Sequence, residues 1–518
     1  MARVSDETRA VVSAPPGTAD AASLSRLAGR HSTAELLGQF VLSRSLDSIP
    51  EGWPTRTRRT WALGAHATLP VRTMRASDGV DVGWLLGFPV DARGYRVEAD
   101  VTLPIPSTAA AAEFETFLYG HGGRYIAVWL APHHERVYLD AGGTLSAVYS
   151  PAHAVVAATP ALVPYTFGCA DDTDLLRVTG MPSSKAVLAF GMTSRVGVER
   201  LLPNHYLDLL EWKARRHWPH QPLDDGADPA EAAEVVARVL ERQIGAVTRD
   251  APAYMSLTAG FDSRTMLACA REHLGRIRFI TLALPDAMGR LDVDVARRIA
   301  RRHGLAHDVL PNLEPDSAEL DAWLWRTGLC VSEPRGWRAV RTYGQLDPSR
   351  PEIVGTAGEV ARAVYWRDCG GGRRDLTADV VVESLMLPKT PGILERARAW
   401  MNGVPATRPM HLIDAIYIEQ RLGCWAGVFA YGDAAQVHCR IKPFVHRDAF
   451  TAMLRLPDAY KLAGRFPREV IASRWPELAR IPFNRRAGAR HYADRLRRRA
   501  HLVRRALARR LPGASPRA

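Results

Sequence analysis

The sequence predicts an α/β protein with an N-terminal antiparallel sheet sandwich and a C-terminal doubly wound parallel sheet. The chain of 518 residues is too long for one ordinary hydrophobic core. Short apolar runs separated by Gly, Pro and His turns dominate residues 35–222, a pattern typical of antiparallel strands. After residue 250, strand-like and helix-like segments alternate, and this order favours a parallel sheet.

The antiparallel part is expected to span residues 34–222. Its clearest strand segments are 82–90, 124–131, 135–141 and 154–160. Residues 1–33 are rich in Ala, Pro, Ser and Gly, and we expect them to be flexible.

The second domain is expected to span residues 223–484 and to begin with a long helix. Asp228 suits the N-cap and Pro229 the first helical position, and an apolar stripe follows at helical spacing. The elements expected next are a strand at 253–257, a helix at 263–273, a strand at 277–282, a helix from Asp292 to His303 and a strand at 306–310. Gly304 suits the end of the second of these helices, and the later segments are mostly helical.

Charge and cysteine usage limit the function classes. The net charge is +13, but residues 485–518 hold 12 arginines and one aspartate, which leaves about +2 for the rest. We expect this basic tail to be a solvated amphipathic helix; weak contact with an anionic membrane and nucleic-acid binding are the alternatives. The six cysteines lack paired spacing, which favours reduced thiols. No apolar run is long enough for a spanning helix, so a cytoplasmic protein is expected.

The turn at residues 258–263 carries the strongest functional signal. Small residues there let backbone N–H groups approach an anion, and a helix N-terminus adds partial positive charge. Asp262 suits such a site only if a cation intervenes, as in Mg²⁺ coordination with a nucleotide. The alternative is an ordinary strand–helix turn with an Asp cap.

Thr258-Ala-Gly-Phe-Asp-Ser263 resembles the S-G-G-x-D-S pyrophosphate loop (PP-loop) of the HUP-like ATP pyrophosphatases. With its position after an N-terminal sheet domain, the loop resembles that of the asparagine synthetase family. The segment 352–366 resembles the family's strand and G-x-G-x-D-E turn, with a single acid remaining. The resemblance implies ATP and Mg²⁺, with Asp262 and Glu359 as metal ligands. The residues that it implies for nucleotide binding are Leu257, Thr258, Ala259, Gly260, Asp262, Ser263, Leu282, Gly355 and Gly358.

Other motifs extend the resemblance. Asp292 lies where the family has an acidic residue before its second helix. We expect Arg362 and Arg367 either to contact a phosphate or a substrate acid or to lie on the surface. Residues 440–457 resemble the family's R-x-P-F-x-D segment. Where the family carries a catalytic lysine near the end, this chain has Arg485 and Arg486, which supply charge but no base. Glu359, Arg485 and Arg486 are therefore the expected catalytic residues.

Residues 122–150 and 201–212 resemble a class II glutamine amidotransferase domain, which has an Ntn-type fold. Its nucleophile is an N-terminal cysteine, but Ala2 follows Met1 here. We therefore expect a degenerate domain without glutamine hydrolysis.

The expected function is an AMP-forming ligase that adenylates a carboxylate and joins it to a substrate amine, on a small molecule or a peptide. Relatives implied by the resemblance include lactam synthetases, lasso-peptide cyclases and proteins of surface-polysaccharide gene neighbourhoods. The alternatives are a non-catalytic scaffold that keeps the fold and a PP-loop enzyme that modifies tRNA. The oligomeric state stays open.

Overall fold

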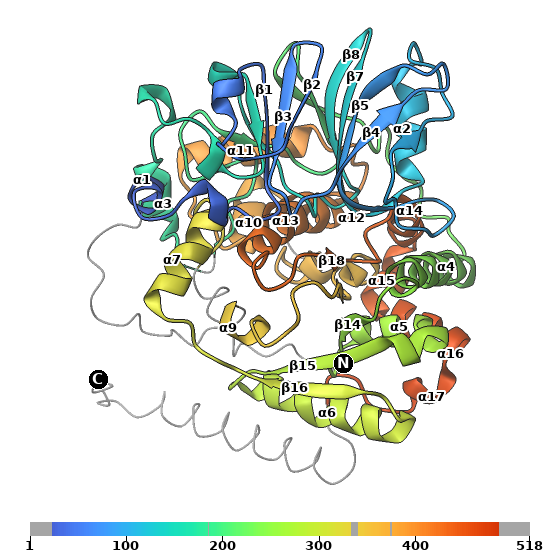
Figure 1. Cartoon of the computed structure of the whole chain (residues 1–518). Coiled ribbons are helices and arrows are strands. Elements are labelled where there is room, and N and C mark those ends of the chain that lie inside the picture. The colour runs from blue at the N-terminus through green and yellow to red at the C-terminus, as the bar shows by residue number, and fades with distance from the viewer. Residues whose placement is uncertain (1–22, 185, 333–339, 373–374, 486–518) are drawn as a thin grey trace, which may run out of the picture.

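The polypeptide forms two antiparallel sheets and one parallel sheet, joined by helices (Figure 1). The computed structural model describes residues 23–184, 186–332, 340–372 and 375–485. The mixed α/β class predicted from the sequence is confirmed. Strand pairs before residue 217 are antiparallel, apart from the short parallel pair of Met74–Arg75 with Val101–Thr102, and strand pairs after residue 252 are parallel.

The two antiparallel sheets face each other across the largest apolar cluster of the molecule. Alternation along β5 and β7 explains this packing: Leu86, Ile126 and Val128 join the inter-sheet core, whereas Leu85 and Trp129 point to the other face, against α2. The six-stranded sheet has the order β11 (Glu199–Arg200), β9 (Val148–Ser150), β10 (Val155–Ala157), β1 (Phe40–Ser43), β3 (Trp61–Ala65) and β2 (Thr55–Arg58). The seven-stranded sheet has the order β13 (Lys213–Arg216), β12 (His205–Asp208), β8 (His134–Leu139), β7 (Gly122–Ala131), β5 (Asp81–Val90), β4 (Val71–Arg75) and β6 (Val101–Thr102).

The parallel sheet places its first strand in the centre. Its order is β16 (His307–Pro311), β15 (Ile277–Ala283), β14 (Ala253–Ser256), β17 (Glu352–Ile353) and β18 (Arg440–Ile441). The direction of winding therefore reverses between β14 and β17, and such a switch point is where open parallel sheets bind ligands. Met255 and Phe279 pack on one face, in the cluster that contains α4, α5, α6 and α16, whereas Tyr254 and Ile280 pack on the other.

The helices before residue 330 are α1 (Leu24–Ala28), α2 (Ala111–Tyr119), α3 (Thr173–Thr179), α4 (Pro229–Thr248), α5 (Phe261–Cys269), α6 (Ala287–His303) and α7 (Ser317–Arg326). Those after it are α9 (Val340–Tyr343), α10 (Ala378–Ser384), α11 (Pro391–Asn402), α12 (Pro409–Ala415), α13 (Gly423–Gly432), α14 (Arg447–Leu454), α15 (Asp458–Ala463), α16 (Phe466–Arg474) and α17 (Pro476–Ala479). A 3₁₀ helix η8 (Gly358–Arg362) and a π-helix η10 (Ile416–Leu422) complete the elements used below.

Several boundaries follow the predicted signals. The Asp228 carboxylate caps α4 by accepting from Ala230 N and Glu231 N, and Gly304 ends α6 with φ 65°. The first helix, Leu24–Ala28, lies where we expected a flexible segment to extend to residue 33, because Leu24 and Leu27 are buried in the core. Residues 1–22 and 486–518, which include most of both predicted terminal segments, lie outside the described residues.

The prediction that Asp292 caps a helix is wrong. Helix α6 begins at Ala287 because Asp286 caps it, accepting from Gly289 N, and Asp292 lies inside the helix. The helix expected at 263–273 begins earlier, at Phe261, ends at Cys269 and is followed by a 3₁₀ segment. Both differences leave the order of elements unchanged.

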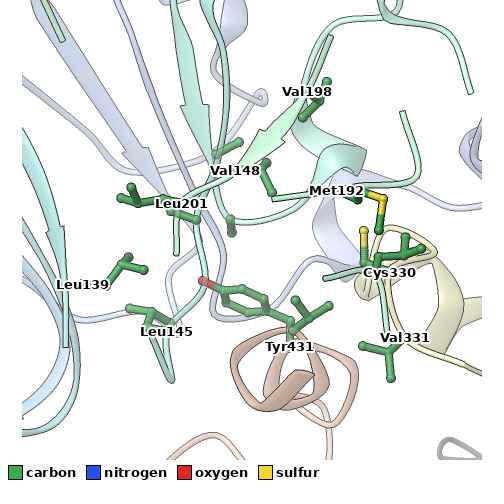
Figure 2. Close-up of a cluster of buried hydrophobic side chains, with 14 of the residues drawn as sticks. Leu139, Leu145, Val148, Met192, Val198, Leu201, Cys330, Val331 and Tyr431 are labelled. Atoms are coloured by element: carbon green, nitrogen blue, oxygen red, sulfur yellow. The ribbon is translucent and has the colours of Figure 1, made fainter. Parts of the chain in front are cut away.

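The helical part packs directly on the antiparallel sheets. Figure 2 shows Tyr431 of α13 near Leu139, Leu145 and Leu201, and its hydroxyl donates to the Ser146 carbonyl over 2.8 Å. A Cβ atom at Gly427 would lie 2.5 Å from the Gly143 carbonyl oxygen, so the close approach of α13 requires glycine there. All six cysteines are free thiols, as expected. Among the described residues, no helix is both long and apolar enough to cross a membrane.

Candidate functional site

The loop after β14 lies at the switch point of the parallel sheet. β14 ends at Ser256, Leu257 is fully buried, and α5 begins at Phe261. β17, the neighbour of β14, ends at Ile353 and leads into a second loop with Gly355 and Gly358. The two loops that the sequence singled out therefore leave the same edge of the sheet side by side.

Hydrogen bonds fix the shape of the first loop. The Ser263 hydroxyl accepts from Thr258 N over 3.1 Å and lies 2.9 Å from the Thr258 hydroxyl, which accepts from Gly260 N over 3.1 Å. Asp292, although inside α6, accepts from Ala259 N over 2.8 Å, so it holds the loop from the next helix. Ala259 does not adopt a positive φ, and alanine is therefore compatible with the turn.

The N-terminus of α5 faces the end of this loop without a side-chain cap. Gly260 is the N-cap residue, and no side chain makes the capping hydrogen bond. The first-turn N–H groups of a helix without such a cap have partial positive charge and suit an anionic oxygen. This is the geometry that a phosphate group would use.

Glycine is required where the second loop meets Asp262. A Cβ atom at Gly358 would lie 2.5 Å from Asp262 Oδ1, and one at Gly355 would lie 3.0 Å from the Asp262 carbonyl carbon. Between them, Ala357 adopts φ 85°, a left-handed conformation that costs a non-glycine residue about 1–2 kcal/mol. The loop thus has a strained backbone conformation at Ala357, next to the close contact with the Asp262 carboxylate. Such backbone strain is common at functional sites.

Two carboxylates and one guanidinium meet at this junction. Arg362 Nη2 donates to Asp262 Oδ2 over 2.5 Å, whereas Asp262 Oδ1 is buried and has no hydrogen-bond partner. Glu359 Oε2 accepts from Ala357 N over 3.0 Å and from the Tyr417 hydroxyl over 2.6 Å. The alternative that Arg362 is a surface arginine is therefore wrong, while Arg367 is exposed.

The pKa of Asp262 is raised from 3.8 to about 7. Burial is the largest cause, Arg362 opposes it, and the charge of Glu359 adds to it. Burial and the nearby Glu359 also raise the pKa of Tyr417 well above its usual value, so its hydroxyl stays protonated at neutral pH. The site therefore contains one carboxyl that changes charge near neutrality.

The arrangement fits a cation that is shared with a ligand. The described residues contain no group of three or more His, Cys, Asp or Glu side chains that could hold a metal ion. Magnesium is usually held by one or two carboxylates together with nucleotide phosphates, and the unpartnered Asp262 oxygen suits that role. Asp262 and Glu359 are the residues that would hold the ion.

The segment 481–485 covers the first loop. Arg264, which is fully buried, donates over 2.6 Å to the carbonyl oxygens of Ile481, Pro482 and Ala259. Burial lowers the pKa of Arg264 to about 9. Asn484 N donates to the Ala259 carbonyl over 3.0 Å.

Aromatic stacking adds to this cover. The rings of Phe261 and Phe483 stack at 4.4 Å, and Arg468 lies over both. The predicted residue Arg485 is exposed beside this segment, and Arg486 lies outside the described residues. Residues 481–484 thus lie over the first loop, and Arg485 follows them in the chain.

The structure brings the predicted loop residues together and adds others. Thr258 to Ser263, Gly355, Gly358 and Glu359 form one cluster, and Leu282 lies half-buried near the end of the adjacent β15. Sequence reasoning missed Tyr417 and the structural role of Arg264. Local spacing could not reveal either, because the partner of Tyr417 lies 58 residues away and two of the three carbonyl partners of Arg264 lie 217 and 218 residues away.

Comparisons with known proteins assign no family. No family model matches the chain, and no curated protein matches it.

Proposed function

We propose that the protein is an ATP-dependent, AMP-forming ligase of the asparagine synthetase type. The observation that carries this proposal is the unpartnered Asp262 oxygen, which packs on Gly358 near the N-terminus of α5. An anion at the helix N-terminus and a cation at the carboxylate together suit Mg·ATP. In the proposed reaction a substrate carboxylate attacks the α-phosphorus, pyrophosphate leaves, and an amine then displaces AMP to form an amide.

The residues of this chain take distinct parts in the proposal. Thr258, Ser263 and Asp292 hold the loop, and the first turn of α5 binds phosphate oxygens. Asp262 and Glu359 hold Mg²⁺, which would neutralise phosphate charge. The Arg362 guanidinium partly neutralises the negative charge of the two carboxylates until the nucleotide binds. It then pairs with the phosphate oxygens. Arg485 would supply the positive charge that a lysine gives in the resembling family.

The N-terminal sheets have a structural role in the proposal. Two facing antiparallel sheets are compatible with an Ntn-type sandwich. Among the described residues before 217 the one cysteine, Cys169, is buried, so we propose that these sheets are a scaffold and that the amine comes from the substrate.

A binding protein without catalysis is the second candidate. The Arg362–Asp262 ion pair favours it, because the guanidinium occupies one of the two carboxylate oxygens that Mg²⁺ would use. A third candidate, tRNA modification, depends on the basic tail, which lies outside the described residues.

Calorimetry of Mg²⁺-dependent ATP binding tests the proposal. Wild-type protein should bind Mg·ATP, Asp262→Asn should weaken binding at least tenfold, and Asp379→Asn, an exposed acid on α10, should leave it unchanged. A screen for pyrophosphate release with candidate acids and amines follows. If neither the wild type nor the control binds Mg·ATP, the ligase proposal is wrong. Binding without pyrophosphate release from any acid would favour the second candidate.

A further inference from the structure

The rings of Phe261 and Phe483 form a stacked pair at the first turn of α5. Phe261 is the first residue of that helix, and Phe483 belongs to the segment that covers the first loop. α16 packs against α5 (Figure 1) and carries Arg468 to both rings. The guanidinium carbon of Arg468 lies 5.3 Å from the Phe261 ring centroid and 4.6 Å from that of Phe483. Such contacts hold an arginine in place while its N–H groups stay available to a ligand.

Two more guanidinium groups lie at the same pair of rings. The guanidinium carbon of Arg264 is 3.8 Å from the Phe483 ring centroid, and that of Arg362 is 5.6 Å from the Phe261 ring centroid. Arg362 also donates to Asp262, so the ring pair adjoins the candidate site. Three positive charges therefore gather beside the N-terminus of α5, which adds partial positive charge of its own.

The three guanidinium groups differ in what they already bind. Arg264 donates to three backbone carbonyl groups, and Arg362 donates to the Asp262 carboxylate. Arg468 is exposed, and within the described part of the chain its guanidinium makes no hydrogen bond and no ion pair. Arg468 is therefore the member of the cluster whose N–H groups can all turn to a ligand.

Gathering like charges in one place has an electrostatic cost. The pKa of Arg264 is lowered to about 9, first by burial and then by repulsion from Arg468. Asp262 and Glu359 offset part of the positive charge, but in the proposed function both hold Mg²⁺. An anion beside Arg468 would remove the repulsion and would be attracted by the whole cluster. A ligand with several negative charges gains most from such an arrangement.

We propose that Arg468, alongside Arg485, binds the pyrophosphate part of the nucleotide and stabilises it as it leaves. This inference rests on the proposed ligase function. In that reaction a carboxylate oxygen forms a bond to the α-phosphorus, the bond to the bridging oxygen breaks, and its electron pair leaves with pyrophosphate. Negative charge therefore builds up on the pyrophosphate oxygens, and the guanidinium supplies positive charge and N–H donors to them. Arg468 keeps its own proton throughout.

Calorimetry with inorganic pyrophosphate and with AMP, each in the presence of Mg²⁺, tests the proposal on the full chain. Arg468→Gln should weaken pyrophosphate binding about tenfold or more and leave AMP binding within about twofold, because AMP lacks the β- and γ-phosphates. Arg468→Lys should recover most of the pyrophosphate affinity, since it restores the positive charge. Arg298→Gln is the matched control, at an exposed arginine of α6 without a described ion pair, and should bind both ligands like the wild type.

Several outcomes would overturn the role of Arg468. They are unchanged pyrophosphate affinity in Arg468→Gln, an equal loss of affinity for pyrophosphate and AMP, and no pyrophosphate binding by the wild type. Should AMP bind too weakly to measure, the lysine variant decides: recovered pyrophosphate affinity supports the proposal, and affinity as low as that of Arg468→Gln refutes it.

The ligase proposal can fail separately from this one. If pyrophosphate binding depends on Arg468 but no acid yields pyrophosphate from ATP, the anion site stands and the ligase proposal is wrong. If an acid does yield pyrophosphate, and Arg468→Gln forms it at the wild-type rate, the ligase stands and the role of Arg468 is wrong.

Discussion

Arg362 and Asp262, one hundred residues apart in the chain, form an ion pair at the switch point of the parallel sheet, with 2.5 Å between Nη2 and Oδ2. The pair leaves the second carboxylate oxygen of Asp262 buried without a partner. This ion pair links the two loops, and its guanidinium offsets one of the two carboxylate charges in the candidate site.

Nucleotide affinity should depend on the ionisation of Asp262. The pKa of this carboxyl is raised to about 7, mainly by burial, and only the ionised form can hold a cation. Affinity for Mg·ATP should therefore fall about tenfold for each pH unit below about 7 and level off above it. Calorimetric titration with ATP at several pH values measures this affinity. Saturating Mg²⁺ suppresses protonation of the terminal phosphate of ATP, so the remaining pH dependence comes from the protein. An affinity independent of pH would exclude Asp262 from the site.

Gly358→Ala should disrupt the contact between the loops. The new Cβ atom would lie 2.5 Å from Asp262 Oδ1, so either loop must move. We expect a loss of about 1–3 kcal/mol in the free energy of unfolding and at least tenfold weaker Mg·ATP binding. Gly275→Ala is the matched control, because nothing lies within 4 Å of its Cβ position. Equal nucleotide binding by both variants would contradict the prediction.

Arg264→Met should release the segment that covers the first loop. It removes hydrogen bonds to three carbonyl groups, and we expect a cost of about 3 kcal/mol in urea unfolding. The Asn484 amide, which donates to the Ala259 carbonyl, should exchange faster with solvent. Arg271→Met serves as the control, because that exposed guanidinium makes one long hydrogen bond of 3.4 Å. The same urea midpoint in both variants would rule out the bracing role of Arg264.

Lys442→Met should stabilise the protein below neutral pH. The Lys442 amine is buried without a hydrogen-bond partner, and burial, with Arg440 and Arg124, lowers its pKa to about 7. Between about pH 7 and about 10.5 the unfolded chain binds the extra proton, so wild-type stability rises with pH across that window. The gain in melting temperature should thus be several degrees at about pH 6 and vanish near pH 10.5.

Differential scanning calorimetry at several pH values measures that gain. Lys389→Met, at an exposed lysine paired with Glu383, should change the melting temperature little at any pH. A lower melting temperature for Lys442→Met at acidic pH would show that the amine has a stabilising partner.

The order of elements could be predicted from the sequence, because the signals are local. The cap at Asp228 and the αL stop at Gly304 act within a few residues of their position. The start of α6 was missed because Asp286 and Asp292 are both plausible caps, and Gly289 inside the first turn weakens the earlier signal.

The side-chain partners in the candidate site could not be predicted in the same way. Arg264 looks like a solvent-exposed helical arginine, and only the distant carbonyls of Ile481 and Pro482 explain its burial. Arg362 and Tyr417 likewise depend on partners far along the chain. Such pairings depend on how distant segments pack together, and the local spacing of residues carries no information about that packing.

The cover over the first loop has a consequence for biosynthesis. Ile481 follows Arg264 by 217 residues, so the ribosome must add that whole stretch before the buried guanidinium can reach its carbonyl partners. The strands of the two antiparallel sheets all lie before residue 217, so they can pair long before then. A nascent chain would thus acquire its sheets early and its finished loop late in translation.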